Sequence, residues 1–387
     1  MTKKSDAPAI RFKGFSDAWE QRKAKEICSI GTGKSNTQDQ VDDGKYPFYI
    51  RSDVPVRSNK YLYNCEAVIT IGDGNIGKVF HYVNGKFDLH QRCYKMTDFK
   101  DIWGKYFFYY FSTKFYDRAM KMTAKATVDS VRLEMISEMD IKKPPQISEQ
   151  KQIAEFFANL DNLITLHQRK FEKLTNVKKS MLEKMVPQHG SSYPEIRFKG
   201  FTDPWEQRKL GEMGQTYTGL SGKTKDDFGH GQARFVTYMN VFSNPISNPE
   251  MTEPIEIDPK QNEVEVGDVF FTTSSETPEE VGMSSILLEK RGKTYLNSFC
   301  FGFRPSEKID SYYLAYMLRS ESTRAKIILL AQGISRYNIS KNKVMEIAVS
   351  LPSLDEQKMI GQYFSQLDNL ITLHQRQPFF IQPRIFL

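Results

Sequence analysis

Two stretches of the chain repeat one pattern of apolar and polar positions. Apolar residues recur three and four positions apart over 153–174 and again over 360–371, and both stretches contain the letters LDNLITLHQR. This spacing puts a narrow apolar stripe along a helix, as in helices that pair with another helix. We therefore predict two similar amphipathic helices that pack on each other. The predicted contact positions are Ile153, Phe157, Leu160, Ile164 and His167 in the first helix and Ile360, Phe364, Leu367, Ile371 and His374 in the second.

Caps and prolines set the expected ends of these helices. Ser148 is suited to cap the first helix, which then runs until Pro187. The second helix is expected to begin at Asp355 and to stop at Pro378. The repeat is lost after Arg376, and the apolar, proline-containing tail that follows predicts a truncated second helix.

A second repeat precedes each module of the chain. The segment IRFKGFSDAWEQRK at 10–23 returns at 196–209 with 12 of 14 positions identical, whereas the modules at 24–147 and 210–352 are largely unrelated. We interpret this as two different modules mounted on one repeated frame. Four regions are expected: a first domain at 1–147, a central helix at 148–187, a second domain at 188–352, and the second repeated helix with its divergent tail at 353–387.

Both modules are predicted to mix strands and helices, so the fold class is α+β. In the first module, β-branched residues flank a Gly-Asp-Gly turn at 67–83, which predicts a hairpin, and an aromatic-rich helix is expected at 102–122. In the second, VGDVFFTTS and TYLNSFCFGFRP are predicted strands, and 311–332 is predicted to be one helix.

Composition narrows the class of protein. No apolar run reaches membrane-spanning length, the N-terminus lacks the apolar core of a secretion signal, and the four cysteines have no metal-ligand spacing. We expect a cytoplasmic protein without membrane partners. The net charge of +7 suggests a polyanionic partner, but acidic residues outnumber basic ones between Leu210 and Pro352. DNA binding would therefore require basic residues gathered on one face.

Several short motifs resemble catalytic or cofactor sites and fail on context. The G-x-G-x-x-G match at 72–77 is followed by a strand-like segment rather than a helix, which favours a hairpin turn over a dinucleotide site. GTGKS at 31–35 and GLSGKT at 219–224 lack the first glycine of a phosphate loop. Asp203-Pro204-Trp205 lacks one proline of the adenine methyltransferase tetrapeptide. We expect no catalytic residue and no bound cofactor on this chain.

Binding remains the expected activity, carried by loop residues that suit phosphates and base edges. An ordinary surface role stays open for each residue taken singly. A metal site at His167 and His374 is a weaker alternative to a hydrogen-bonded pair position. The candidates for DNA contact are Lys34, Asn75, Lys78, Arg92 and Lys125 in the first module and Lys223, Ser274, Ser275, Arg336, Tyr337 and Asn338 in the second.

The layout resembles the specificity subunit of type I restriction-modification systems. The resemblance is carried by EQKQIAEFFANLDNLITLHQRK and its twin EQKMIGQYFSQLDNLITLHQR, by the repeat at 10–23 and 196–209, and by GISRYNIS followed by LPSLDEQ. It implies two target recognition domains separated by an antiparallel coiled coil, each reading one half of a bipartite, asymmetric DNA site in defence against foreign DNA.

The resemblance also implies the partners. A non-catalytic subunit of this kind binds double-stranded DNA and recruits two modification subunits, which bind S-adenosylmethionine, and restriction subunits, which use ATP and Mg. A helical scaffold protein that binds other proteins through its two modules is the alternative. A self-contained methyltransferase is disfavoured because the catalytic tetrapeptide and the cofactor loop are missing.

Overall fold

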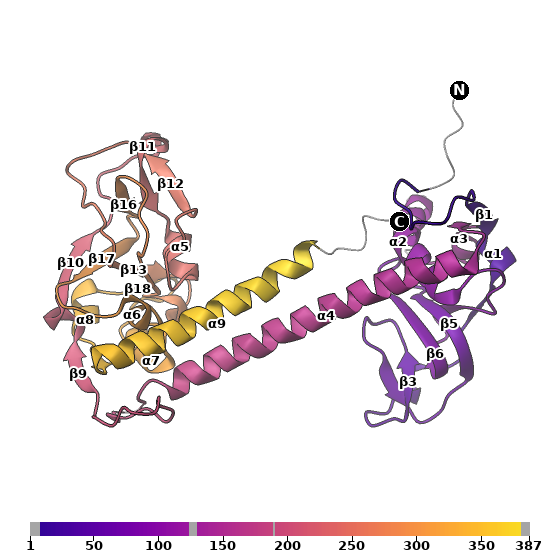
Figure 1. Ribbon diagram of the computed structural model, residues 1–387, viewed down its shortest axis with the longest axis horizontal. Coiled ribbons are helices and arrows are strands. Elements are labelled where there is room, and N and C mark those ends of the chain that lie inside the picture. Colours follow the sequence, from indigo (N-terminus) through magenta and orange to yellow (C-terminus); the bar gives the residue numbers. More distant parts are fainter. Residues whose placement is uncertain (1–7, 124–129, 189, 381–387) are drawn as a thin grey trace. The chain divides into compact units, whose positions relative to one another are not determined.

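The computed structural model describes residues 8–123, 130–188 and 190–380, which form two compact units (Figure 1). The first unit extends to His167, and the second comprises Gln168–Arg376. Each unit combines sheets with helices, in agreement with the predicted α+β class. Within the described ranges, no helix is long and apolar enough to cross a membrane.

The first unit is built on an antiparallel sheet with the strand order β2-β7-β5-β6, which β3 and β4 extend beyond β6. Strands β5 and β6 form the hairpin that the sequence predicts. The aromatic helix α2, also predicted, packs on this sheet, where Phe111 and Phe115 meet the ring of Phe80 edge to face. Its elements are β1 (Glu20–Lys23), α1 (Ala24–Ile27), β2 (Ser29–Thr32), β3 (Tyr46–Tyr49), β4 (Val56–Ser58), β5 (Tyr63–Ile71), β6 (Phe80–Leu89), β7 (Cys93–Thr97), α2 (Gly104–Thr123), α3 (Leu133–Ser137), β8 (Asp140–Lys143) and the first part of α4 (Ile147–Lys184).

The second unit contains an antiparallel sheet of the same order, β10-β17-β13-β15, although its sequence is unrelated. A three-stranded sheet, β12-β11-β16, is added to it, and α6 and α9 contribute to its main core. Its elements are β9 (Glu206–Lys209), β10 (Gly214–Thr218), β11 (Phe228–Val236), α5 (Tyr238–Ser243), β12 (Thr252–Ile255), β13 (Val269–Thr272), β14 (Ser274–Ser275), β15 (Ser284–Ile286), β16 (Thr294–Leu296), β17 (Cys300–Pro305), α6 (Ser311–Met317), α7 (Glu321–Ile328), β18 (Tyr337–Asn338), α8 (Lys341–Met345), β19 (Ala348–Leu351) and α9 (Leu354–Phe380), besides the second part of α4.

Three helix predictions are wrong. Ser148 does not cap the first long helix, because α4 already begins at Ile147. The single helix expected at 311–332 is divided into α6 and α7, because the hydroxyl of Ser320 accepts a hydrogen bond from the backbone N–H of Thr323 and caps a new helix. Helix α9 does not stop at Pro378 but continues to Phe380. A proline in the last turn removes a single backbone hydrogen bond and need not end the helix at that residue.

The repeated segments contact each other within each unit. Strand β1 pairs with β8, and β9 pairs with β19 in the same antiparallel register. Arg11 donates two hydrogen bonds to the buried carboxylate of Glu149, at 2.6 and 2.7 Å, and Arg197 donates the equivalent pair to Glu356, at 2.7 and 2.8 Å. We call each such set the frame: residues 10–23, β8 and the start of α4 in the first unit, and residues 196–209, β19 and the start of α9 in the second.

Aromatic side chains complete the two frames in the same way. Trp19 meets Tyr106 edge to face, and Trp205 meets Tyr313. One helical turn further, Tyr109 donates a hydrogen bond to Asp161, and Tyr316 donates one to Asp368. These tyrosines lie on α2 and α6, inside the unrelated modules, so each module carries its own attachment to the frame.

The predicted helix-to-helix contact positions lie mostly inside the two cores. Ile153 and Phe157 are buried in the core of the first unit, with Leu160 packed against it, whereas Ile360, Phe364 and Leu367 are buried in the core of the second. These apolar positions therefore join each helix to its own unit, and packing of the two predicted stripes on each other stays a prediction. The remaining predicted positions, Ile164, His167, Ile371 and His374, are partly exposed.

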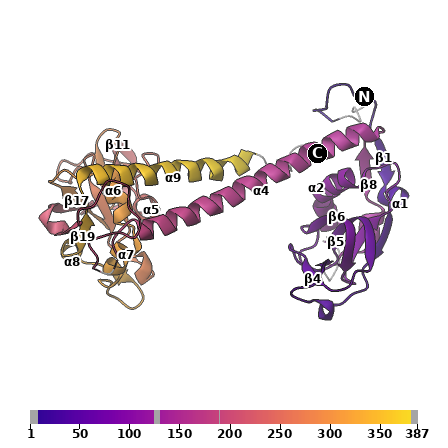
Figure 2. The same cartoon turned by 60° about the horizontal axis from the view of Figure 1, so that its bottom comes forward.

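Helix α9 does lie against the second part of α4, within the second unit. The two helices run side by side in opposite directions there (Figures 1 and 2). Leu174, Met181 and Leu182 of α4 pack on the core that contains Phe364 and Leu367, and the Lys178 ammonium lies 2.5 Å from the Asp368 carboxylate. These α4 residues follow the repeated decapeptide, so the contact joins unlike parts of the two repeats.

Candidate nucleic-acid interface

Four of the five candidates in the first module lie on three adjacent loops. The backbone N–H of Gly72 donates to the carbonyl of Arg92, and Ser35 bridges to His90, so the loops that carry Lys34, Arg92 and Asn75 with Lys78 are neighbours. The four candidate side chains are exposed. Lys125 lies outside the described residues.

Asp73 organises the charges at this site. Its carboxylate accepts a hydrogen bond from Arg92 at 2.7 Å and two from Arg51 at 3.2 Å. Burial alone would raise the pKa of Asp73, but these two guanidinium groups outweigh burial and lower it. Burial, together with the charge of Arg51, also lowers the pKa of His90. Two arginines thus share one carboxylate and keep a net positive charge at the loop surface.

In the second module, five candidates come together through one short pair of strands. Strand β14 pairs with β18, so that Ser274 lies opposite Asn338 and Ser275 lies opposite Tyr337. Arg336 precedes β18, and its guanidinium lies 5.7 Å from the ring centre of Phe299. Sixty residues of sequence separate the two groups, and the fold alone brings them together.

The two sites occupy equivalent places in the two units. Each follows a central strand of the common sheet, β5 in the first unit and β13 in the second. Val131 donates a backbone hydrogen bond to the carbonyl of Gly72, as Ile339 does to that of Thr273. The next residue in each unit, Asp73 or Ser274, then pairs with the strand-like segment that precedes a short helix. Unrelated modules therefore present their candidate residues from the same position on the sheet.

Lys223 does not join this group. Its ammonium lies 2.9 Å from Asp258 and 3.8 Å from Asp227, and its side chain is only 12% exposed. The hydrogen bond from Lys223 lowers the pKa of Asp258 far below its ordinary range. This ion pair ties the loop after β10 to residues 35 positions away, and the geometry disfavours a phosphate contact.

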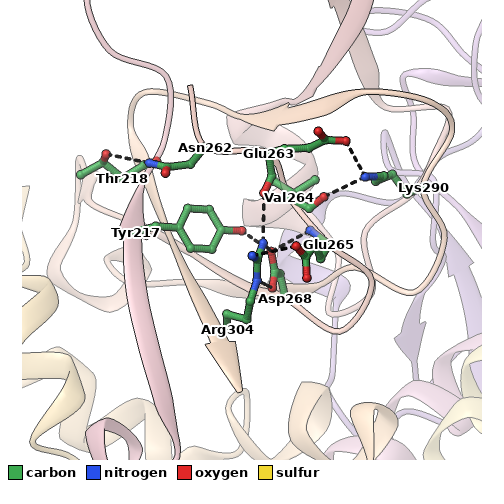
Figure 3. Close-up of polar contacts among 9 residues, drawn as sticks. All are labelled: Tyr217, Thr218, Asn262, Glu263, Val264, Glu265, Asp268, Lys290 and Arg304. Atoms are coloured by element: carbon green, nitrogen blue, oxygen red, sulfur yellow. Dashed lines mark hydrogen bonds and ion pairs between the residues drawn. The ribbon is translucent and has the colours of Figure 1, made fainter. Parts of the chain in front are cut away.

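A buried polar network fixes the strand that leads to Ser274 (Figure 3). Asp268, directly before β13, is 1% exposed and accepts hydrogen bonds from Arg304 at 2.8 and 2.7 Å and from the Tyr217 hydroxyl. Arg304 also donates to the carbonyl of Glu263, whose carboxylate pairs with Lys290 at 2.7 Å. Burial and the adjacent Asp268 charge raise the pKa of Tyr217, which keeps it a proton donor to this carboxylate.

Sequence reasoning missed several residues at these sites. Arg51 lies in a polar loop with no local signal, and it reaches Asp73 only in the fold. Tyr238 and Phe242 of α5 stack beside Ser274, and Glu280 accepts a hydrogen bond from Ser275. In the described part of the chain, no group of three or more His, Cys, Asp or Glu side chains could hold a metal ion.

Comparison with known families decides what kind of protein this is. The family model for the type I restriction modification DNA specificity domain matches twice, at residues 16–176 and 202–381. The chain belongs to this family. It is a non-catalytic specificity subunit of a type I restriction-modification system, and each match spans one module with its repeated helix.

Relatives and solved structures agree with this assignment. The type I restriction enzyme MjaVIII specificity subunit of Methanocaldococcus jannaschii is 24% identical, over 93% of this chain and 88% of its own length. The crystal structure of the S subunit from M. genitalium shares the fold with a TM-score of 0.58 at 14% identity, covering 97% of this chain and 95% of that one. A structure from work on the assembly and conformational transition of a type I R-M system gives 0.53 at 13% identity, over 96% and 94%.

Proposed function

We propose that each module of this specificity subunit reads one half of a bipartite, asymmetric DNA site. The observation that carries the proposal is that the two candidate sites lie at equivalent places on two sheets with the same strand order. Their different side chains would read different sequences, since hydrogen-bonding groups at base edges carry specificity while phosphate contacts set position. The Arg51–Asp73–Arg92 cluster suits the backbone of the first half-site, and β14 with β18 suits the second.

We further propose that α4 and α9 form an antiparallel coiled coil that separates the two readers. The support comes from the second unit, where Leu174, Met181 and Leu182 pack against the core that includes α9 and Lys178 pairs with Asp368. A rigid helical spacer would set the distance between the half-sites along the duplex. In this proposal the predicted positions Ile164, His167, Ile371 and His374 contribute to the pair.

The recognition subunit would act through partners. Methyltransferase subunits, two per complex, would bind S-adenosylmethionine, and restriction subunits would bind ATP and Mg, while this chain carries none of these cofactors. The alternative of a protein-binding scaffold is not favoured by the family assignment. Salt-dependent binding to duplex DNA separates the two, because phosphate contacts release counterions.

A chain that carries the first module twice tests the proposal. Backbone hydrogen bonds from Ala24 to Met139 and from Leu210 to Ile347 mark equivalent module ends, so 24–139 can replace 210–347 without changing either frame. We expect the methylated sequence to contain the first half-site twice. The original bipartite site should lose at least about 10³-fold in affinity, to the level of non-specific DNA.

The reciprocal chain, with 210–347 in both positions, serves as the control and should duplicate the other half-site. Methylome sequencing of cells that express each chain with its partner subunits gives the readout. A methylated sequence that keeps its second half unchanged after the first exchange would rule out independent modules.

A further inference from the structure

A polar hollow adjoins the β14–β18 pair of the second unit. It encloses about 540 Å³ and is lined by Tyr238, Met239, Phe242, Ser274, Ser275, Glu276, Glu280, Ser335 and Arg336. One wall is aromatic, because the rings of Tyr238 and Phe242 stack at an interplanar angle of 18°. The hydroxyl of Tyr238 donates a 2.7 Å hydrogen bond to the carbonyl of Ser274, which fixes this wall against β14.

The hydrogen-bonding capacity of the hollow is only partly used. Ser274 is 4% exposed, yet its buried hydroxyl has no hydrogen-bond partner within the described residues. The neighbouring Ser275 hydroxyl donates to one oxygen of Glu280 at 3.2 Å, which orients the carboxylate and leaves its other oxygen without a bond from the described chain. A buried unpartnered hydroxyl is unfavourable unless a ligand completes it, since it has lost its hydration.

The two carboxylates that line the hollow make it unsuitable for the phosphates of the DNA backbone. Glu276 and Glu280 would repel a phosphate, so these carboxylates weaken affinity unless they meet a hydrogen-bond donor. In the major groove, the donors are the amino groups of adenine and cytosine, whereas guanine and thymine present O6 and O4 acceptors. Only adenine has an acceptor, N7, beside its amino group on the same base. A carboxylate beside a hydroxyl that can donate matches this pair.

We propose that the hollow receives the major-groove edge of an adenine in the half-site of the second module. Glu280 accepts a hydrogen bond from the N6 amino group, and Ser274 donates one to N7. Arg336, at the edge of the hollow, is placed to reach the adjacent phosphate. This inference rests on the proposed function, and it makes Glu280 and Ser274 specificity-determining residues.

The first test determines which DNA sequence is methylated by the complex of the full chain with its modification subunits. We expect Glu280→Gln to relax one A·T position of the second half-site and to leave the first half-site unchanged, because an amide can donate to O6 or O4. Glu279→Gln is the matched control, since it removes the same charge at the preceding residue, which does not line the hollow. An unaltered sequence with Glu280→Gln would overturn the inference.

The second test uses a site duplex with 7-deazaadenine, which replaces N7 by C–H, at the position identified above. The unmodified chain should bind this duplex roughly 5- to 150-fold more weakly than the adenine duplex, as expected for a lost base-edge pair. Ser274→Ala should bind both duplexes equally. Equal binding of both by the unmodified chain would overturn the role of Ser274.

The experiments distinguish failure of the proposed function from failure of adenine recognition by the hollow. If the unmodified complex writes no sequence-specific methylation and the chain binds all duplexes alike, the proposed function fails. If the unmodified complex writes a bipartite sequence but no A·T position in its second half depends on Glu280, only the adenine hollow fails.

Discussion

The two units differ in a consistent way: their frames share the strand pairing, the arginine–glutamate ion pair and the tryptophan–tyrosine contact, whereas their modules share the order of four strands and the attachment to the frame but little sequence. The clasps Arg11–Glu149 and Arg197–Glu356 have the same geometry within 0.1 Å, whereas the Asp268 network has no equivalent in the first unit as described. Frame residues are fixed by their mutual contacts, so a change in one disturbs several others. The residues of the module loops are constrained by the ligand instead, and they can differ without loss of the fold.

The largest expected effect concerns the buried network around Asp268, which belongs to the second unit. Asp268→Asn leaves Arg304 without its buried counter-charge and should lower the free energy of unfolding of that unit by about 3 kcal/mol. Hydrogen exchange should become faster in β13 and β17 and stay unchanged in the first unit. Glu265→Gln, which removes a solvent-exposed partner of the same arginine, should cost less than about 1 kcal/mol. Equal losses from both variants would contradict this account.

A smaller effect should be equal in both units. Glu149→Gln and Glu356→Gln each break one bidentate clasp whose carboxylate is almost fully buried, while the arginine stays 13 to 15% exposed. Each variant should lower the stability of its own unit by about 2 kcal/mol, as measured by chemical denaturation with hydrogen exchange to identify the unit. Glu155→Gln, on the exposed face of α4, is the control. A twofold difference between the two clasps would mean that the frames are not energetically equivalent.

The smallest expected effect concerns the contact between α4 and α9 in the second unit. Lys178→Met removes the ion pair to Asp368, which keeps its hydrogen bond from Tyr316. A partly exposed pair of this kind contributes about 0.5 kcal/mol, and the contribution should fall with added salt. Lys173→Met, five residues earlier on the exposed surface of α4, provides the comparison. A loss that persists at 1 M salt would show that the methylene chain of Lys178, rather than its charge, supports α9.

The frame was accessible from the sequence because it is written twice. The repeats indicated the long helices and the division into two modules, while β-branched residues around a Gly-Asp-Gly turn indicated the hairpin and aromatic residues indicated α2. Tyr106 and Tyr313 escaped notice because the helices around them share no further letters. Their equivalence rests on their positions against Trp19 and Trp205.

The candidate sites were predicted as residue types but not as arrangements. Loop position suggested Ser274, Arg336 and Asn338, yet their proximity depends on the pairing of β14 with β18, which has no local signature. The ion pair between Lys223 and Asp258 has no local signature either, since the two residues lie 35 positions apart in the sequence. Ile153 and Phe157 lie in the core of the first unit, and Ile360 and Phe364 lie in that of the second, because an amphipathic pattern shows that a helix face is buried and not which surface buries it.

In each unit, the strand pair that closes the module brings the two ends of the module together. Lys23 lies opposite Asp140, and Lys209 lies opposite Ala348, so the chain leaves the frame and returns to it through adjacent residues. A segment inserted between these two residues enlarges the module and leaves the frame unchanged. Lengthening such an excursion is inexpensive, because each doubling of a loop costs only about 0.6 kcal/mol in closure entropy. The inserted segment is 116 residues long at 24–139 and 138 residues long at 210–347, so equivalent attachment points accept a second module that is 22 residues longer than the first.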